Sequence, residues 1–198
     1  MRALLILVTI ILSAAARLFA SPPDINFTDD GRAEVSPDLT ILGDAQVSVE
    51  AMWTFVAEVN PDFDPAIAEA YYRIGQRYGI RGDVALCQAI IETGWFTFSG
   101  GTAVTPDQHN YCGLGVTRLG LRGHSFADVD EGITAQIQHL YAYATNAALP
   151  EGERRIDPRF QYVKRATAPR WADLDNRWAA SSTYSASILK LYAQLLTY

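Results

Sequence analysis

The stretch that most constrains the fold covers residues 83–96 and reads DVALCQAIIETGWF. Its apolar residues lie almost all the way round a helical wheel, and a helix without a polar face is normally buried at the centre of a domain. Asp83 is placed to cap the start of this helix and Gly94 to end it. We therefore expect the other elements of the chain to pack around one central helix.

One ionisable side chain, Glu92, stands at the C-terminal end of this stretch. The negative end of the helix dipole does not stabilise a carboxylate there, and desolvation raises a carboxyl pKa. Both effects suit a group that must hold a proton near neutral pH. Two interpretations stay open at this point: a catalytic acid, or a surface glutamate at a frayed helix end.

Length and composition indicate a single globular domain with appendages. The chain has 198 residues, of which 49% are hydrophobic, and its formal net charge is −6. Because no basic run is present that could follow a phosphate backbone, nucleic acid is not an expected partner. An anionic wall polymer would have to be held by stacking and hydrogen bonds rather than by overall charge.

Residues 1–20 are expected to form an export signal. Arg2 gives the positive start, residues 3–16 the apolar run, and residues 14–16 or 18–20 a small-residue exit. Arg17 interrupts the run before it could comfortably span a bilayer, so we expect no stable membrane insertion after cleavage; an uncleaved anchor is the alternative. The mature protein is then expected to be secreted or held in the cell envelope.

The two cysteines, Cys87 and Cys112, allow one disulfide, which an exported chain could form. Such a bridge would join the central helix to the loop at residues 111–115. The competing interpretation is two small buried hydrophobes, because Cys87 lies within the apolar helix. The sequence leaves both open.

Outside the central stretch, residues 21–47 are rich in Pro, Asp, Gly and Ser and are expected to be a linker or N-terminal arm. Residues 48–198 then form the domain, and residues 111–126 are predicted to be a small β-hairpin or flap. The fold class is mainly α with a small β element. The expected helix signals are Ser48 as a cap, Asp64-Pro65 with Gly79 as a stop, Asp128-x-x-Glu131, and a last helix over about residues 182–196.

Metal and serine chemistry find no support in the sequence. The three histidines lack the paired spacing of a zinc site, and no Gly-x-Ser-x-Gly is present. We therefore expect neither a metal nor a cofactor.

A single acid among aromatics and amides remains. Flat aromatic rings stack on sugar faces, and amides hold hydroxyl and acetamido groups, so the combination suits a polysaccharide groove. A core role is the alternative for Trp95 and Tyr111, since that is the commoner fate of such aromatics. The candidate substrate-binding residues around Glu92 are Gln88, Trp95, Asn110 and Tyr111.

Four motifs in order resemble the bacterial peptidoglycan endo-β-N-acetylglucosaminidases, the cell-wall autolysins that share their domain with flagellar rod-cap muralytic enzymes. They are GDVALCQAIIETGWF at 82–96, NYCGLG at 110–115, Ser-Phe at 125–126 before EGITAQIQHL at 131–140, and Tyr184-x-x-x-Ile188. The resemblance covers about residues 48–198.

The resemblance implies a lysozyme-like α domain, with a hairpin flap beside a groove, that cleaves the β-1,4 bond following N-acetylglucosamine. It implies Glu92 as general acid, Tyr184 as support for the reacting sugar and Tyr111 in the loop motif. Glycan strands of peptidoglycan are the expected partner, and we expect a monomer.

The sequence departs from the family at the second catalytic group. Many members carry a second carboxylate on the hairpin, but residues 117–126 contain no acid. Asp128, Asp130 and Glu131 follow, although capping accounts for the first and last of them. Either the N-acetyl group of the substrate attacks the anomeric carbon, or one of these three acids is the second acid on a mobile flap.

Two other functions remain as alternatives. A lytic transglycosylase also needs one carboxylic acid on a lysozyme-like scaffold. A non-catalytic glycan-binding module would explain the missing hairpin acid, but the retention of Glu92 with Gln88 and Trp95 argues against it.

Overall fold

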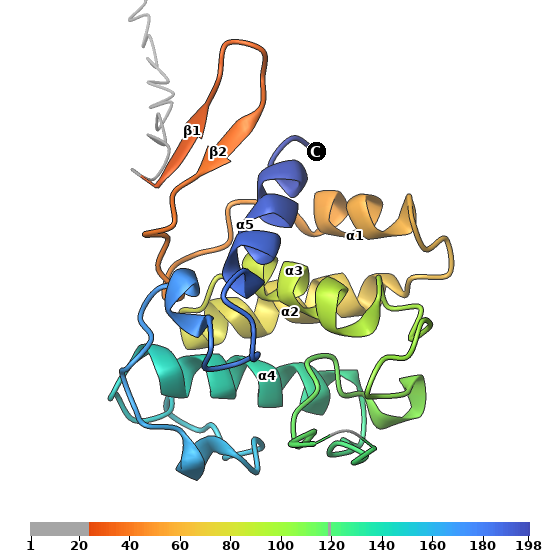
Figure 1. The fold of residues 1–198 in the computed structure, drawn as a ribbon, viewed down its shortest axis with the longest axis vertical. Helices are drawn as coiled ribbons and strands as arrows, with labels where there is room; N and C mark the ends of the chain where they lie inside the picture. The colour runs from red at the N-terminus through yellow and green to blue at the C-terminus, as the bar shows by residue number, and fades with distance from the viewer. Residues whose placement is uncertain (1–23, 119) are drawn as a thin grey trace, which may run out of the picture.

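The computed structural model describes residues 24–118 and 120–198, and this part of the chain is mainly helical (Figure 1). The expected export signal at residues 1–20 lies outside the described residues. The helices are α1 (Val49–Ala57), α2 (Pro65–Tyr78), α3 (Gly82–Thr93), α4 (Val129–Ala144) and α5 (Tyr184–Leu195), with the 3-10 turns η1 (Pro106–Gln108), η2 (Phe160–Tyr162) and η3 (Trp171–Leu174). One antiparallel pair, β1 (Ile25–Phe27) and β2 (Ala33–Val35), precedes them.

Local capping chemistry sets three of the helix starts as predicted. The Ser48 side chain accepts a hydrogen bond from the Ala51 amide (3.1 Å) at the start of α1. Asp64 and Asp128 do the same at the starts of α2 and α4, with accepting distances of 2.9 Å each. A serine or aspartate in this position satisfies an amide that has no partner within the helix.

The central helix α3 is buried as its sequence predicts. Every residue from position 82 to position 90 is buried, and the helix ends at Gly94, which adopts a left-handed conformation (φ 59°). Asp83 does not cap α3, because the helix already begins at Gly82. Its carboxylate instead accepts hydrogen bonds from the Gln46 amide (2.7 Å) and the Tyr192 hydroxyl (3.1 Å), so it ties α3 to the N-terminal arm and to α5.

Helix α3 lies between α2 and α5, and α2 in turn packs against α4 (Figure 1). The α2–α3 crossing is unusually close because two glycines meet there. A Cβ added at Gly82 would lie 2.1 Å from the Tyr71 carbonyl oxygen, and one at Gly75 would lie 2.8 Å from the Gly82 Cα.

Gly82→Ala is therefore expected to destabilise the protein. The backbone of α2 would have to move away, and forcing extra volume into a packed core costs about 1–3 kcal/mol. Urea denaturation measures the change in the free energy of unfolding. Ser187→Ala, at an exposed position of α5, is the control; equal stability of the two variants would contradict the close crossing.

The β-hairpin lies in the N-terminal arm and not at residues 111–126. Among the described positions of 111–126 no strand forms, because the loop is held by side-chain contacts rather than by a ladder. The arm packs on the domain: Leu39 and Ile41 are fully buried, and the Ile41 amide donates to the Pro169 carbonyl (2.8 Å). The hairpin itself lies beside α5 (Figure 1), so part of the expected linker belongs to the core.

Both cysteines are free and buried, and no disulfide joins them. Cys87 belongs to the main core, whereas Cys112 packs in a smaller cluster with Leu114 and Ala135. The disulfide prediction is therefore wrong, and the alternative of two small buried hydrophobes describes both residues. Among the described residues, no helix has the length and apolar character needed to cross a bilayer.

Candidate functional site

Glu92 lies in the last turn of α3, where the helix reaches the surface, and it is partly buried. The Tyr184 hydroxyl, at the start of α5, donates to Glu92 Oε1 at 2.5 Å. Burial raises the pKa of Glu92, while hydrogen bonds from the side chains of Tyr184 and Trp178 act against that rise. The Tyr184 hydroxyl thus holds the carboxyl group in a site whose desolvation favours the protonated form.

A chain of hydrogen bonds within the core points at this carboxyl group. The Tyr71 hydroxyl donates to Gln136 Oε1 (2.6 Å), and Gln136 Nε2 donates to Gln88 Oε1 (2.9 Å). Gln88 Nε2 donates to the Tyr184 hydroxyl (3.0 Å), which donates to Glu92. Because all four bonds run in one direction, each polarises the next and strengthens the donor that reaches the carboxylate.

Interrupting this chain is expected to raise the pKa of Glu92. Gln136→Leu removes the donor behind Gln88, and Tyr71→Phe removes only the first hydroxyl; both weaken stabilisation of the charged form of Glu92. A general acid works only while protonated, so the alkaline limb of the activity profile should move to higher pH. The measurement is kcat/KM against pH on glycan strands.

Gln76→Leu, at an exposed position of α2, is the matched control and should leave that limb in place. An unmoved alkaline limb in folded Gln136→Leu and Tyr71→Phe proteins would show that the chain does not tune Glu92.

The four candidate substrate-binding residues lie in different settings. The Gln88 side chain is fully buried within the hydrogen-bond chain. Trp95 packs on Phe55, with ring centroids 5.3 Å apart. Tyr111 is buried and packs on Phe96, at 5.8 Å between centroids. Contact of these side chains with a substrate stays a prediction.

Asn110 organises the loop that approaches Glu92. Its Nδ2 donates to the carbonyls of Leu114 and His124 (2.9 Å each), and its Oδ1 accepts from the Leu114 amide (3.0 Å). The loop thereby brings Gly113 close to the acid: a Cβ added there would lie 3.6 Å from Glu92 Oε2, and its φ of 68° favours glycine. Asn110 therefore acts on the site through the backbone of the loop.

The three candidate second acids are engaged elsewhere. Asp128 caps α4, Asp130 pairs with Arg73 (2.8 Å), and Glu131 pairs with Arg154 (2.6 Å). None of them is among the groups that shift the pKa of Glu92 or line the cavity beside it. The structure does not bring them together with Glu92.

A cavity of about 190 Å³ lies near Glu92, although Glu92 itself does not line it. Gly113 and Trp178, both neighbours of the acid, form part of its wall. The other lining residues come from the 110–117 loop, α4 and the segment before α5: Cys112, Leu114, Gly115, Val116, Thr117, His139, Tyr143, Arg159 and Arg177.

Buried polar contacts shape one wall of this cavity. His139 Nδ1 lies 2.7 Å from Asp157 Oδ2, and Asp157 Oδ1 accepts from the Arg159 amide at 2.7 Å. Trp178 and Tyr143 pack edge-on against the His139 ring, with centroids 5.0 and 5.4 Å away. This wall was not predicted from the sequence. A charged Asp-Pro-Arg run at 157–159, in a stretch with no helical pattern, was the available signal, since such loops often carry function.

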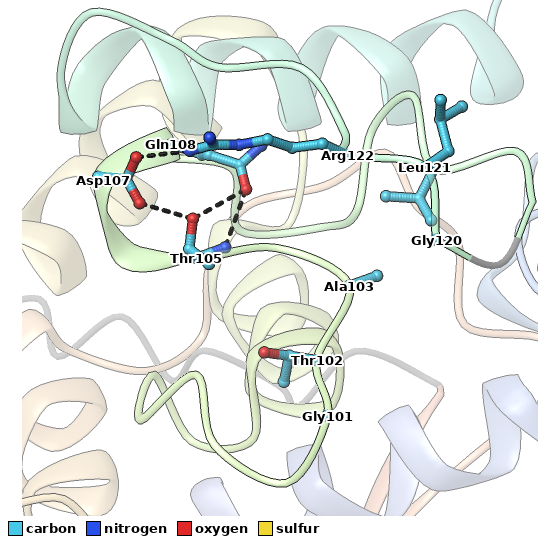
Figure 2. Close-up of a pocket in the computed structure, with 10 residues that line it drawn as sticks. Gly101, Thr102, Ala103, Thr105, Asp107, Gln108, Gly120, Leu121 and Arg122 are labelled. Carbon is cyan, nitrogen blue, oxygen red and sulfur yellow. Dashed lines mark hydrogen bonds and ion pairs between the residues drawn. The ribbon is translucent and has the colours of Figure 1, made fainter.

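A larger hollow of about 700 Å³ lies between the loop at 101–108 and the turn at 120–122 (Figure 2). Arg122 pairs with Asp107 (2.6 Å), which also accepts from the Thr105 hydroxyl (2.6 Å), so these contacts tie the two loops together. Glu92 lines neither this hollow nor the smaller cavity, but its neighbours Gly113 and Trp178 line only the smaller one. The smaller polar cavity is therefore the one that adjoins the candidate acid.

The chain is similar to known proteins in sequence and in structure. The sequence model of the Glucosaminidase family, described as mannosyl-glycoprotein endo-beta-N-acetylglucosaminidase, matches residues 68–197. An uncharacterized protein of Borreliella burgdorferi is 33% identical over 162 residues, which cover 80% of this chain and 78% of that protein.

Two solved structures are also similar. S. aureus autolysin E in complex with the muropeptide NAM-L-Ala-D-iGlu aligns with a TM-score of 0.51 and 11% identity, over 87% of this chain and 84% of that one. The catalytic domain of the Listeria monocytogenes autolysin Auto aligns with a TM-score of 0.42 and 16% identity, over 74% of this chain and 86% of that one. The family match covers well over half of the residues, so the chain belongs to the Glucosaminidase family and is a glycoside hydrolase of the endo-β-N-acetylglucosaminidase type.

Proposed function

We propose that the protein hydrolyses the β-1,4 bond that follows N-acetylglucosamine in peptidoglycan glycan strands, with Glu92 as general acid. The observation that carries the proposal is the Glu92 carboxyl group, desolvated at the end of α3, held by Tyr184 and adjoining a polar cavity. Family membership supports the type of bond. The muropeptide bound by the autolysin of similar fold supports the polymer.

The first chemical step uses Glu92 in its protonated form. Its proton passes to the glycosidic oxygen while the bond between that oxygen and the anomeric carbon breaks. Burial raises the pKa of the Tyr184 phenol, and the neighbouring Glu92 charge adds to this, so Tyr184 remains a donor throughout. Tyr184 thereby holds the acid in place before the transfer and stabilises the carboxylate after it.

The same step needs a group that attacks the anomeric carbon as the protonated leaving oxygen departs. Because Asp128, Asp130 and Glu131 are capping or paired with arginines, we favour the acetamido oxygen of the substrate as the attacking group. The resulting cyclic intermediate is opened by water, whose proton returns to the Glu92 carboxylate. This leaves a reducing sugar end and restores the acid.

The site of action in this proposal is outside the cytoplasmic membrane, where peptidoglycan lies, with residues 1–20 directing export.

Mass spectrometry of digested cell-wall sacculi tests the proposed reaction. The expected products carry a reducing N-acetylglucosamine end. An anhydro sugar end would identify a lytic transglycosylase instead, and binding without any cleavage would identify a glycan-binding module. Either of these results would refute the proposal.

A further inference from the structure

Two arginines that the catalytic proposal leaves unused line the cavity beside Glu92. Arg159 follows the buried Asp157, and Arg177 precedes Trp178 in the segment before α5. Gly113 and Trp178 connect this cavity to the acid, because both line it and both neighbour the Glu92 carboxyl group. A sugar whose glycosidic oxygen reaches Glu92 therefore places its substituents near these arginines.

Both arginines line the same cavity, Arg159 half-buried and Arg177 exposed. Burial raises the pKa of Tyr143, and the positive charges of Arg177 and Arg159 both act against that rise, so both lie near the same phenol in the cavity wall. The backbone amide of Arg159 donates a hydrogen bond to Asp157 Oδ1. The guanidinium carbon of Arg159 lies 5.7 Å from the centroid of the Tyr162 ring.

Neither arginine forms an ion pair with Asp or Glu within the described part of the chain, although the charge of Arg177 acts on the Asp173 carboxylate. Asp157, the acid beside them, is bound by His139 and by the Arg159 amide. Neither arginine contributes to the shift in the pKa of Glu92. By contrast, six other arginines are paired with carboxylates: Arg32, Arg73, Arg77, Arg122, Arg154 and Arg170.

Two cations that line one cavity repel each other, and an anion bound between them lowers that repulsion. Guanidinium groups bind carboxylates through paired, directional hydrogen bonds, which makes arginine well suited to recognise one. The chain has a net charge of −6, so this pair is a local positive site in an acidic protein.

We propose that Arg159 and Arg177 form a subsite for a carboxylate carried by the muramic acid residue on the leaving side of the scissile bond. The inference rests on the proposed function. In that reaction the leaving oxygen is O4 of muramic acid, and the adjacent O3 carries the lactyl group. The carboxylate is either that of a bare lactyl group or the first acidic group of a stem peptide, and the experiment below distinguishes the two.

Binding measurements on Glu92→Gln protein test the subsite without turnover. The probes are purified glycan strands with stem peptides, strands stripped of peptides, and both kinds after carbodiimide-driven amidation of their carboxyl groups. Calorimetry gives Kd for each. Carboxylate-bearing strands are expected to bind about tenfold or more tightly than the amidated ones, because amidation removes the charge-assisted hydrogen bonds to the two arginines.

The same measurement on Arg159→Gln and Arg177→Gln, singly and together in that background, should reduce or abolish the preference. Arg32→Gln removes an equal charge on the N-terminal hairpin, where Arg32 pairs with Asp30 (2.8 Å), and should leave the preference intact. If native strands bind more tightly than amidated ones even after the peptides are stripped, the ligand is the lactyl carboxylate. If native strands bind more tightly only when they carry peptides, the ligand is a carboxylate of the stem peptide.

Equal Kd values for native and amidated strands would overturn the subsite, whether or not the arginine variants fold. An undiminished preference in the folded double variant would also overturn it. Failure of the subsite leaves cleavage of sacculi by the unaltered protein unaffected, whereas failure of the proposed function appears as loss of that cleavage. The two proposals therefore fail separately.

Discussion

Glu92→Gln is expected to remove wall-lytic activity while leaving the fold intact. Glutamine keeps the size of the side chain and an oxygen that can accept the Tyr184 hydrogen bond (2.5 Å in the unaltered protein), but it has no proton to donate. Losing general acid catalysis typically costs about 10²–10⁴-fold in rate. The loss is measured as the rate at which the turbidity of a suspension of purified sacculi falls.

The free energy of unfolding of the Glu92→Gln protein provides a control, because the sign of its change is predicted. Burial raises the pKa of Glu92 above its ordinary value, so the charged form destabilises the folded state once the pH rises above that ordinary value. Glu92→Gln removes the penalty. The variant should be at least as stable as the unaltered protein at neutral pH, and this advantage should disappear in acid.

A folded Glu92→Gln protein that kept more than about a tenth of the lytic activity would contradict the role of Glu92, because general acid catalysis is worth more than that. Lower stability of the variant at neutral pH would contradict the desolvation of the carboxyl group.

Tyr184→Phe is expected to lower activity on the order of 10²-fold, the usual cost of removing one preorganised donor at a reacting centre. The hydroxyl donates to Glu92 (2.5 Å) and accepts from Gln88 Nε2 (3.0 Å), so its loss frees the acid and breaks the hydrogen-bond chain. In a substrate-assisted reaction it also removes a group that could position the acetamido oxygen. Steady-state kinetics on glycan strands measure kcat and KM separately.

Replacing each of the three acids at the start of α4 by its amide completes this experiment. Asp128→Asn, Asp130→Asn and Glu131→Gln should each keep most of the activity, since these acids cap α4 or pair with arginines. At most, lost caps should cost about 0.5–2 kcal/mol of stability each. If one amide were as damaging as Glu92→Gln in a folded protein, that acid would be the second catalytic group and substrate assistance would be excluded.

The sequence by itself determined the helices and the candidate acid. Ser48, Asp64 and Asp128 act on amides within their own first turns, and Gly79 and Gly94 take left-handed conformations directly after the helices they end. These are interactions between residues a few positions apart. The burial of α3 was readable for a similar reason, because a helix that is apolar on every face has only one stable environment.

The partners of the acid were decided by tertiary structure. Gln88 was predicted to contact substrate, but Tyr71 on α2 and Gln136 on α4 draw its amide into the hydrogen-bond chain. No spacing in the sequence connects positions 71, 88, 136 and 184. Their contact depends on how α2, α3, α4 and α5 cross, which is set by packing across the whole core.

Tertiary structure likewise decided the location of the hairpin, the separation of the two cysteines and the cavity beside Glu92. The glycine-rich turns at 111–126 fit a hairpin locally, yet strands form only where a partner strand lies alongside, and here that happens in the N-terminal arm. Arg159 and Arg177 stand in loops without periodicity, and they line one cavity only because the folded chain brings the two loops together. Local chemistry thus determined which segments are helical and where the candidate acid lies, whereas long-range packing determined what surrounds it.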